Sequence, residues 1–291
     1  CVSDTRSSKG KVLVVAGSDS GGGAGIQADI KSIMAQGAYA GTAISALTAQ
    51  NTLGVQDIMA VPPAFVAAQM TSILSDIGAD MMKTGMLATR EVIEAVAEQR
   101  SDLAPQLPMI VDPVMVATSG DKLLQDSAMD ALVSLLVNHA LIVTPNLPEA
   151  GLLTRRDVDT LDDMKRAADT LMRDGAHAAL IKGGHGTGKV VTDLLATQSG
   201  FEVFEHERLN TKNTHGTGCT LASALAGQLA NAIANAGVAA NSEDAPLDSK
   251  GRPDDAVLKT ACEAALAYVH RAITNAPNIG GGNGPLGHGV T

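Results

Sequence analysis

Residues 209–230 read LNTKNTHGTGCTLASALAGQLA, a polar run that passes through two glycines into an apolar, alanine-rich segment. Gly216-Thr217-Gly218-Cys219 lies where a helix is predicted to begin. Glycine lets the backbone approach a ligand closely, and the first turn of a helix presents unpaired N–H groups at the positive end of its dipole. The stretch therefore predicts an anion site at the start of a helix, most naturally for a phosphate group.

Apolar strands and helical segments alternate on both sides of this stretch. The run at 11–17, KVLVVAG, is apolar almost throughout, which is typical of a strand buried on both faces. Further strands are predicted at 42–48, 55–61, 80–86, 109–112, 141–144 and 178–182. Helices are predicted over 26–36, 63–77, 89–99, 125–137, 161–174, 220–236 and 256–275. Such alternation predicts an α/β fold in three layers, with a mostly parallel sheet in the middle.

The edges of the sheet are predicted to be antiparallel. Segments 190–197 and 201–209 are separated by Gln198-Ser199-Gly200, which indicates a hairpin at one edge, and 55–61 is expected at an edge or paired locally. No linker, repeat or change of composition divides the chain, so we expect a flexible tail at 1–10 and a single domain over 11–291. The polar connection at 241–253 is expected to be a surface loop, and the glycine-rich segment 280–289 to wrap the surface or fray.

Composition excludes several classes of function. The formal net charge is −10 and no run of Lys or Arg occurs, which argues against a nucleic-acid partner. Cys1, Cys219 and Cys262 lie far apart without CxxC spacing, which argues against disulfides and structural zinc and favours a cytoplasmic setting. The polar first residues and the lack of an apolar run of 18 residues indicate neither secretion nor a membrane partner.

Two phosphate-binding fingerprints nearly match and are rejected. Gly183 to Lys189 fits GxxxxGK, but Val190 follows where a P-loop needs Ser or Thr for magnesium. Gly23 to Ala28 fits a loose GxGxxA, but Gln50 and Asn51 follow the next strand where a dinucleotide site needs an acidic residue. A nicotinamide enzyme is therefore disfavoured.

A second glycine loop, at 17–25, also opens a predicted helix, and together with 216–219 it is expected to converge on one edge of the sheet. Asp112 and Glu149 each follow an apolar strand beside proline, which suits magnesium because this ion prefers carboxylates, water and phosphate oxygens. For either carboxylate alone, a helix cap or a solvated loop acid is the slightly better interpretation.

Three other side chains have both a functional and an ordinary interpretation. Lys182 ends a strand and either faces the anion site or extends along the surface to solvent. Asp29 on the first helix either faces a ligand or is a surface acid. Cys219, at a helix start, is predicted to have a lowered thiol pKa, unless it is a small packed residue. His185, His206 and His215 share no ligand spacing and are assigned to no metal.

The chain resembles the bacterial hydroxymethylpyrimidine/phosphomethylpyrimidine kinases, within the ribokinase-like superfamily. The resemblance covers roughly residues 11 to 289 and is highly specific, because seven motifs occur in family order. These motifs are Gly17 to Asp29 (GSDSGGGAGIQAD), Thr48 to Thr52 (TAQNT), Lys83 to Met86 (KTGM), Val111 to Val114 (VDPV), Pro145 to Glu149 (PNLPE), Lys182 to His185 (KGGH) and Lys212 to Cys219 (KNTHGTGC).

This resemblance implies an αβα sandwich, a homodimer, and transfer of the γ-phosphoryl group of ATP, with Mg²⁺, to 4-amino-5-hydroxymethyl-2-methylpyrimidine or its monophosphate. It implies that Gln50 pairs with the pyrimidine edge, that Asp29 lies beside the substrate, and that Gly17 and Met86 line its pocket. It further implies an anion hole made by Gly216, Thr217, Gly218 and Cys219, magnesium held by Asp112 and Glu149, and phosphates held by Lys182. Cys219 lies where relatives carry a catalytic aspartate, so it is a candidate base or a residue that shapes the pocket.

Two alternatives stay open at this point. One is a pyridoxal kinase of the same superfamily, because its substrate is also a hydroxymethyl-bearing aromatic heterocycle. The other is a non-catalytic nucleotide-binding module, against which the presence of Asp112, Lys182 and the segment 216–219 argues.

Overall fold

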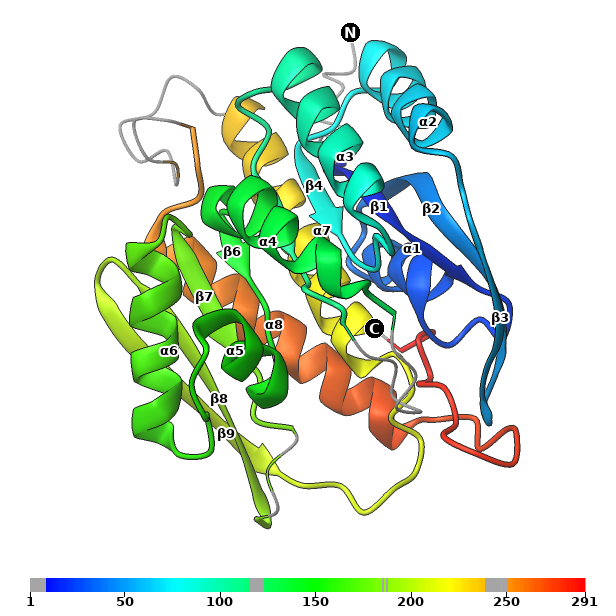
Figure 1. Ribbon diagram of the computed structural model, residues 1–291. Helices are drawn as coiled ribbons and strands as arrows, with labels where there is room; N and C mark the ends of the chain where they lie inside the picture. Colours follow the sequence, from blue (N-terminus) through cyan, green and yellow to red (C-terminus); the bar gives the residue numbers. More distant parts are fainter. Residues whose placement is uncertain are drawn as a thin grey trace, which may run out of the picture.

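The computed structural model describes residues 9–115, 123–184, 186, 188–238, 247 and 251–290 (Figure 1). Residues 1–8 of the predicted tail at 1–10, His185, and most of the predicted loop at 241–253 lie outside these residues. Gly10, at the end of the predicted tail, is buried, and its N–H donates to Oδ1 of Asn231 at 2.9 Å. The start of the first strand is therefore held against the helix that carries Asn231.

Nine strands form one sheet in the order β3-β2-β1-β4-β5-β6-β7-β8-β9. Strands β2, β1, β4, β5, β6 and β7 pair with one another in parallel. The pairs β2–β3, β7–β8 and β8–β9 at the two edges are antiparallel, as predicted. The strands are β1 (Lys11–Asp19), β2 (Tyr39–Asn51), β3 (Gly54–Ala60), β4 (Met81–Thr84), β5 (Met109–Val111), β6 (Ile142–Val143), β7 (Ala178–Ile181), β8 (Val190–Thr197) and β9 (Gly200–Glu207).

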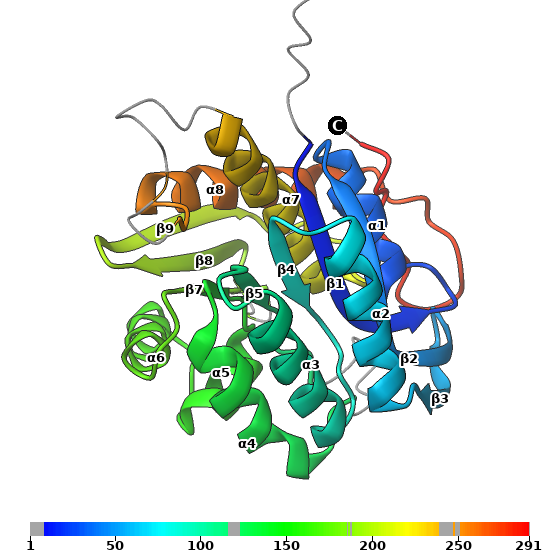
Figure 2. The ribbon, with the colours of Figure 1, turned by 90° about the horizontal axis from the view of Figure 1, so that it is seen from above.

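Helices cover both faces of the sheet (Figure 2). They are α1 (Gly25–Ala35), α2 (Pro63–Asp76), α3 (Arg90–Leu103), α4 (Met129–Ala131), α5 (Leu147–Thr154), α6 (Leu161–Arg173), α7 (Thr217–Val238) and α8 (Asp255–Thr274). Alternate residues of β1 enter different cores: Leu13 and Val15 pack with α2 to α6, and Val12 and Val14 with α1, α7 and α8. Because both faces of β1 are buried, its sequence is apolar without alternation. The predicted three-layer αβα class is confirmed.

Two segments differ from the prediction. The helix predicted over 125–137 is a succession of a 3₁₀ turn, the single α turn α4, a π turn at Leu132–Leu136 and a second 3₁₀ turn. The wider π turn lets Leu132, Leu136 and Val137 all reach the core. Helix α5 lies between the predicted strand at 141–144 and the predicted helix at 161–174, where no helix is predicted, and Pro148 lies in its first turn. Proline is tolerated in the first turn of a helix, where its missing N–H has no partner to lose.

The ends of the parallel strands meet at one edge of the sheet. Strand β1 ends at Asp19, β2 at Asn51, and Asp112 and Lys182 directly follow β5 and β7. Ligands of open α/β sheets bind at this carboxyl edge, so the topology brings the candidate residues together.

Candidate active site

The first glycine loop is organised by Asp19, the last residue of β1. Its carboxylate accepts hydrogen bonds from the backbone N–H groups of Gly21, Gly23 and Ala24 at 2.8, 2.9 and 2.8 Å. Burial acts to raise the pKa of this carboxyl, but the bonds to His215 and to the loop hold it below its usual value. Asp19 is therefore an anion that holds the loop in shape. Sequence reasoning gave it no role, although an Asp before a run of glycines signals such a turn.

The two glycine loops are in direct contact, as predicted. Gly216 has φ +81°, and a Cβ added there would lie 1.9 Å from the carbonyl oxygen of Gly23. A Cβ at Gly23 would lie 2.5 Å from the ring of His215. Only glycine allows the loops to approach this closely, so the start of α7 and the start of α1 form one surface.

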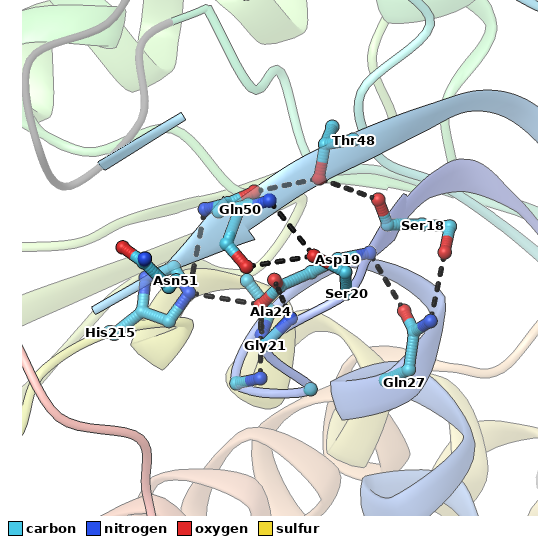
Figure 3. Close-up of polar contacts among 12 residues, drawn as sticks. Ser18, Asp19, Ser20, Gly21, Ala24, Gln27, Thr48, Gln50, Asn51 and His215 are labelled. Atoms are coloured by element: carbon cyan, nitrogen blue, oxygen red, sulfur yellow. Dashed lines mark hydrogen bonds and ion pairs between the residues drawn. The ribbon is translucent and has the colours of Figure 1, made fainter. Parts of the chain in front are cut away.

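A polar network joins this contact to Gln50 on β2 (Figure 3). Nε2 of His215 lies 3.0 Å from Oδ2 of Asp19 and 3.5 Å from the side-chain amide of Gln50. The other side of that amide lies 3.1 Å from the hydroxyl of Thr48. His215, which is assigned to no metal from the sequence, is 7% exposed, and its Nε2 contacts both Asp19 and Gln50.

Gly17 and Met86, which the resemblance implies line the substrate pocket, lie against each other. A Cβ at Gly17 would lie 2.6 Å from Cε of Met86, and the Ser45 hydroxyl donates to the Met86 carbonyl at 2.6 Å. Because no side chain intervenes at Gly17, the methionine lies directly against the end of β1.

A buried cluster of charges lies beside the first turn of α7. Nζ of Lys182 is 2.9 Å from Oδ1 of Asp112 and 3.9 Å from Oε2 of Glu149. A Cβ at Gly218 would lie 3.1 Å from Nζ of Lys182 and 3.8 Å from Oδ2 of Asp112. The turn therefore has no side chain between its backbone and the ammonium group. The hydroxyl of Thr217 donates to the Thr214 carbonyl at 2.7 Å, which fixes the start of the helix.

The two carboxyls of this cluster have opposite pKa shifts. Burial acts to raise the pKa of Asp112, but Lys182 and Lys83 hold it below the usual value. Burial raises the pKa of Glu149 to about 7, against the influence of Lys182. Glu149 also belongs to a capping box, since its Oε2 accepts from the backbone N–H of Asn146 at 2.8 Å. The capping interpretation of Glu149 is thus correct, whatever else its second oxygen does.

The cluster fits a magnesium ion. Oδ2 of Asp112 is buried without a hydrogen-bond partner among the described residues. Across those residues no group of three or more His, Cys, Asp or Glu side chains forms a ready metal cage. Magnesium needs none, because it is commonly held by one or two carboxylates, water and substrate phosphates.

The structure contradicts the predicted acidity of Cys219. Its side chain is only partly exposed, and burial raises the pKa of the thiol to about 12, although the ammonium of Lys83 opposes this. Asp29 and Asp112 add to the rise. The expectation of a lowered pKa considered the helix dipole alone and omitted burial and the two carboxylates.

Asp29 is not a surface acid and does not face open solvent. Its carboxylate is fully buried and pairs through Oδ1 with Nζ of Lys83 at 2.9 Å and with the hydroxyl of Ser223 at 2.6 Å. Burial acts to lower the pKa of Lys83, but Asp29, Cys219 and Asp112 raise it above the usual value, so this lysine stays charged. In this structure Asp29 neutralises a buried cation that also faces Cys219.

The glycine-rich segment before the C-terminus wraps the site and does not fray. The His215 N–H donates to the Gly284 carbonyl at 3.1 Å, and Nε2 of His288 lies 2.9 Å from the hydroxyl of Thr220. His288 is buried, which lowers its pKa to about 4. The last part of the chain thus packs against both ends of the His215 to Thr220 segment.

This chain belongs to the phosphomethylpyrimidine kinase family, whose family model matches residues 19–241. It is 44% identical to a hydroxymethylpyrimidine/phosphomethylpyrimidine kinase of Rhizobium meliloti, over 95% of this chain and 96% of that one. It is 43% identical to a bifunctional thiamine biosynthesis protein of Geobacter sulfurreducens, over 96% of this chain, but spans only 52% of that longer protein. The family membership makes the chain a phosphotransferase, which confirms the expected enzyme class.

The fold is also similar to a solved pyridoxal kinase. The structure of the Staphylococcus aureus enzyme in complex with ADP matches with a TM-score of 0.81 and 32% identity, over 97% of this chain and 94% of that chain. The fold therefore does not separate the two kinds of kinase, whereas the sequence identities favour the pyrimidine kinases.

Proposed function

We propose that this protein uses ATP to phosphorylate 4-amino-5-hydroxymethyl-2-methylpyrimidine and its monophosphate, for thiamine biosynthesis. The observation that carries the proposal is the continuous site that runs from Gln50 through His215 and the paired glycine loops to Lys182. One end of it has an amide suited to a heterocycle edge, and the other has a cation beside a helix start, suited to phosphates. Membership of the phosphomethylpyrimidine kinase family supports the choice of substrate.

In this proposal the pyrimidine lies against Gln50, Gly17 and Met86, with its hydroxymethyl group toward Cys219. The first turn of α7, with Gly216, Thr217 and Gly218, faces the transferred phosphoryl group. Phosphoryl transfer depends on positioning and on charge stabilisation more than on covalent chemistry, and a helix start supplies both.

Lys182 holds a phosphate oxygen, and its ammonium is available for this because it is charged and lies beside Gly218. Asp112 and Glu149 are the proposed ligands of Mg²⁺, through the unpartnered Oδ2 of Asp112. When bound, the ion neutralises negative charge on the phosphates. Asp29 is proposed to act behind the substrate, through Lys83, rather than by open contact with it.

Cys219 is proposed to shape the pocket beside the hydroxymethyl group. A thiol with a pKa near 12 is almost entirely protonated at neutral pH, so it is a poor acceptor for the hydroxyl proton. In a loose transition state that proton leaves late, which reduces the need for a base.

The test is an assay of ADP formation with three acceptors: the pyrimidine alcohol, its monophosphate and pyridoxal. We expect turnover with both pyrimidines. Phosphorylation of pyridoxal alone would overturn the proposal in favour of a pyridoxal kinase, which the likeness to the S. aureus structure makes the second candidate. Lys182→Met should lower kcat by about 10²–10³-fold. Lys259→Met is the matched control, because Lys259 is 42% exposed and pairs with Glu202 instead.

A homodimer and a cytoplasmic location are proposed as well. Leu47 and Met59 lie directly opposite each other on β2 and β3, and both are exposed, at 38% and 62%. Such a pair at a sheet edge suits contact with a second copy, which sedimentation velocity would detect.

Cys219 and Cys262 are free thiols, which suits a reducing compartment. Among the helices of the described residues, none is both long and apolar enough to cross a membrane.

A further inference from the structure

We propose that the Asp19–His215 pair fixes the orientation of the Gln50 carboxamide, with its oxygen toward His215 and its nitrogen toward Thr48, and so determines which way round the heterocycle binds. The inference rests on the proposed function and assigns His215 as a positioning residue for substrate selection. Figure 3 shows the residues concerned.

His215 carries a hydrogen on the ring nitrogen that faces Asp19. Oδ2 of Asp19 accepts from the N–H groups of Gly23 and Ala24, and Oδ1 accepts from Gly21. A carboxylate held by three amide donors is ionised and can only accept. The ring nitrogen 3.0 Å from Oδ2 must therefore carry a hydrogen, so Nε2 of His215 is a donor.

One atom of the Gln50 amide faces this nitrogen at 3.5 Å. A protonated Nε2 has no lone pair in the ring plane, so an NH₂ group there would bring two donors together. The amide oxygen in that position would be attracted to the same N–H. Figure 3 draws the nitrogen on this side, and a half-turn about the last side-chain bond exchanges the two atoms without moving any other.

Thr48 favours the same orientation, because its hydroxyl is closer to the Ser18 carbonyl than to the Gln50 amide. Its hydroxyl lies 2.9 Å from the Ser18 carbonyl, which can only accept, and 3.1 Å from the other end of the Gln50 amide. A hydroxyl has one proton. When that proton is given to Ser18, the Thr48 oxygen is left as an acceptor, which is satisfied by the NH₂ group and not by the amide oxygen.

The backbone of Gln50 is fixed separately. The Ser20 hydroxyl accepts from the Gln50 N–H and donates to the Gln50 carbonyl, each at 2.8 Å. These backbone bonds do not prevent the terminal amide of Gln50 from rotating. His215 and Thr48 both oppose that rotation. A third residue, Asp19, acts only through His215.

The fixed amide offers a ligand an acceptor near His215 and a donor near Thr48. A heterocycle with an amino group next to a ring nitrogen matches this pattern when its amino group lies on the His215 side. In the same pose, a ring that carries an oxo group beside a ring N–H presents the reverse pattern. It pairs only if the amide or the ring itself turns over, and a turned ring no longer places its hydroxymethyl group in the same position. A hydrogen-bonding site discriminates strongly against such a mismatch, because its polar groups are left unpaired.

The experiment compares His215→Leu, which removes the donor, with His215→Gln, whose terminal NH₂ reaches a similar position and can still donate to Asp19. For each protein, kcat/KM is measured with the 4-amino pyrimidine alcohol and with its 4-oxo analogue. We expect the preference for the amino compound to fall by about tenfold or more in His215→Leu and to return in His215→Gln. The KM for ATP should stay within about threefold. An unchanged amino/oxo preference in His215→Leu would overturn the proposal, even if total activity falls.

A second measurement needs no substrate, so it separates this inference from the proposed function. In the ¹⁵N-labelled protein, the side-chain NH₂ protons of Gln50 should show nuclear Overhauser contacts to the Thr48 methyl group and not to the His215 ring. Contacts to the His215 ring instead would refute the orientation. If wild type phosphorylates no pyrimidine but the NH₂ protons contact Thr48, the proposed function fails and the orientation of the amide stands.

Discussion

Replacing Lys83 with methionine should destabilise the protein severely, because it leaves Asp29 as an uncompensated buried charge. Both side chains are 0% exposed and lie 2.9 Å apart. Removing one partner of a buried ion pair costs about 3–5 kcal/mol. With about 2.1 cal/mol/K of unfolding entropy per residue, 291 residues give about 0.6 kcal/mol/K, so Tm should fall by about 5–8 °C. Urea titration and calorimetry of wild type and Lys83→Met measure both quantities.

The pH dependence of this loss has a definite sign. Burial already raises the pKa of Asp29, and without Lys83 it rises further above the unfolded value of about 3.9. A group whose pKa is raised by folding contributes stability below the unfolded pKa and loses it as pH rises through the folded pKa. The deficit of Lys83→Met should therefore be smaller at pH 5 than at pH 8.

The matched control is the double variant Lys83→Met with Asp29→Asn, which removes both charges and keeps an acceptor for Ser223. It should recover most of the lost free energy of unfolding, because a neutral pair has no ionic desolvation cost. The reasoning is refuted if the double variant is no more stable than the single one, or if Lys83→Met loses less than about 1 kcal/mol.

Three further predictions follow from the site. Alkylation of Cys219 by iodoacetamide at pH 8 should be on the order of fiftyfold slower than alkylation of free cysteine, because the pKa of its thiol is about 12. The rate is measured by peptide mass spectrometry. A reaction as fast as that of free cysteine would contradict the raised pKa. In metal-free buffer, the stability of Glu149→Gln relative to wild type should increase by up to about 3 kcal/mol as the pH rises from 5 to 8. The reason is that the pKa of Glu149 is raised to about 7, so wild type loses stability as this carboxyl ionises. A stability difference that does not change with pH in urea titrations would count against this prediction. Gly216→Ala should lower the free energy of unfolding by at least about 2 kcal/mol, since φ at Gly216 is +81° and the new Cβ would meet the Gly23 carbonyl. Gly37→Ala is the control: Gly37 has φ +79°, but a Cβ there has nothing within 4 Å, so its free energy of unfolding should fall clearly less in the same titration.

Most of the fold follows from local sequence patterns. Period and composition predict the buried strand β1, the antiparallel edges and the long helix α7, because each depends on residues close together in the chain. Helix α5 was missed, although Asn146 and Glu149 have the three-residue spacing of a capping box at a helix start.

The arrangement of the site is harder to predict because it joins distant residues. Lys83 and Asp29 are 54 positions apart, and the ion pair depends both on how α1 packs on β1 and on how β4 pairs with β1, which no local pattern states. The same holds for His215 and Asp19, which are 196 positions apart. The acidity of Cys219 was mispredicted for a related reason: the helix start is visible in the sequence, but the two carboxylates that oppose a thiolate are not.

Because Gly284 and His288 pack against the segment His215–Thr220, the site is complete only after these residues have been synthesised. A ribosome has already released β1, β2 and the first glycine loop when the residues that complete the site are still being translated. His215 emerges 196 residues after Asp19, its partner, and His288 emerges 68 residues after Thr220. Nascent chains that stop before residue 284 should therefore carry an unfinished site on an otherwise well-paired sheet, and would be exposed to proteases at the start of α7.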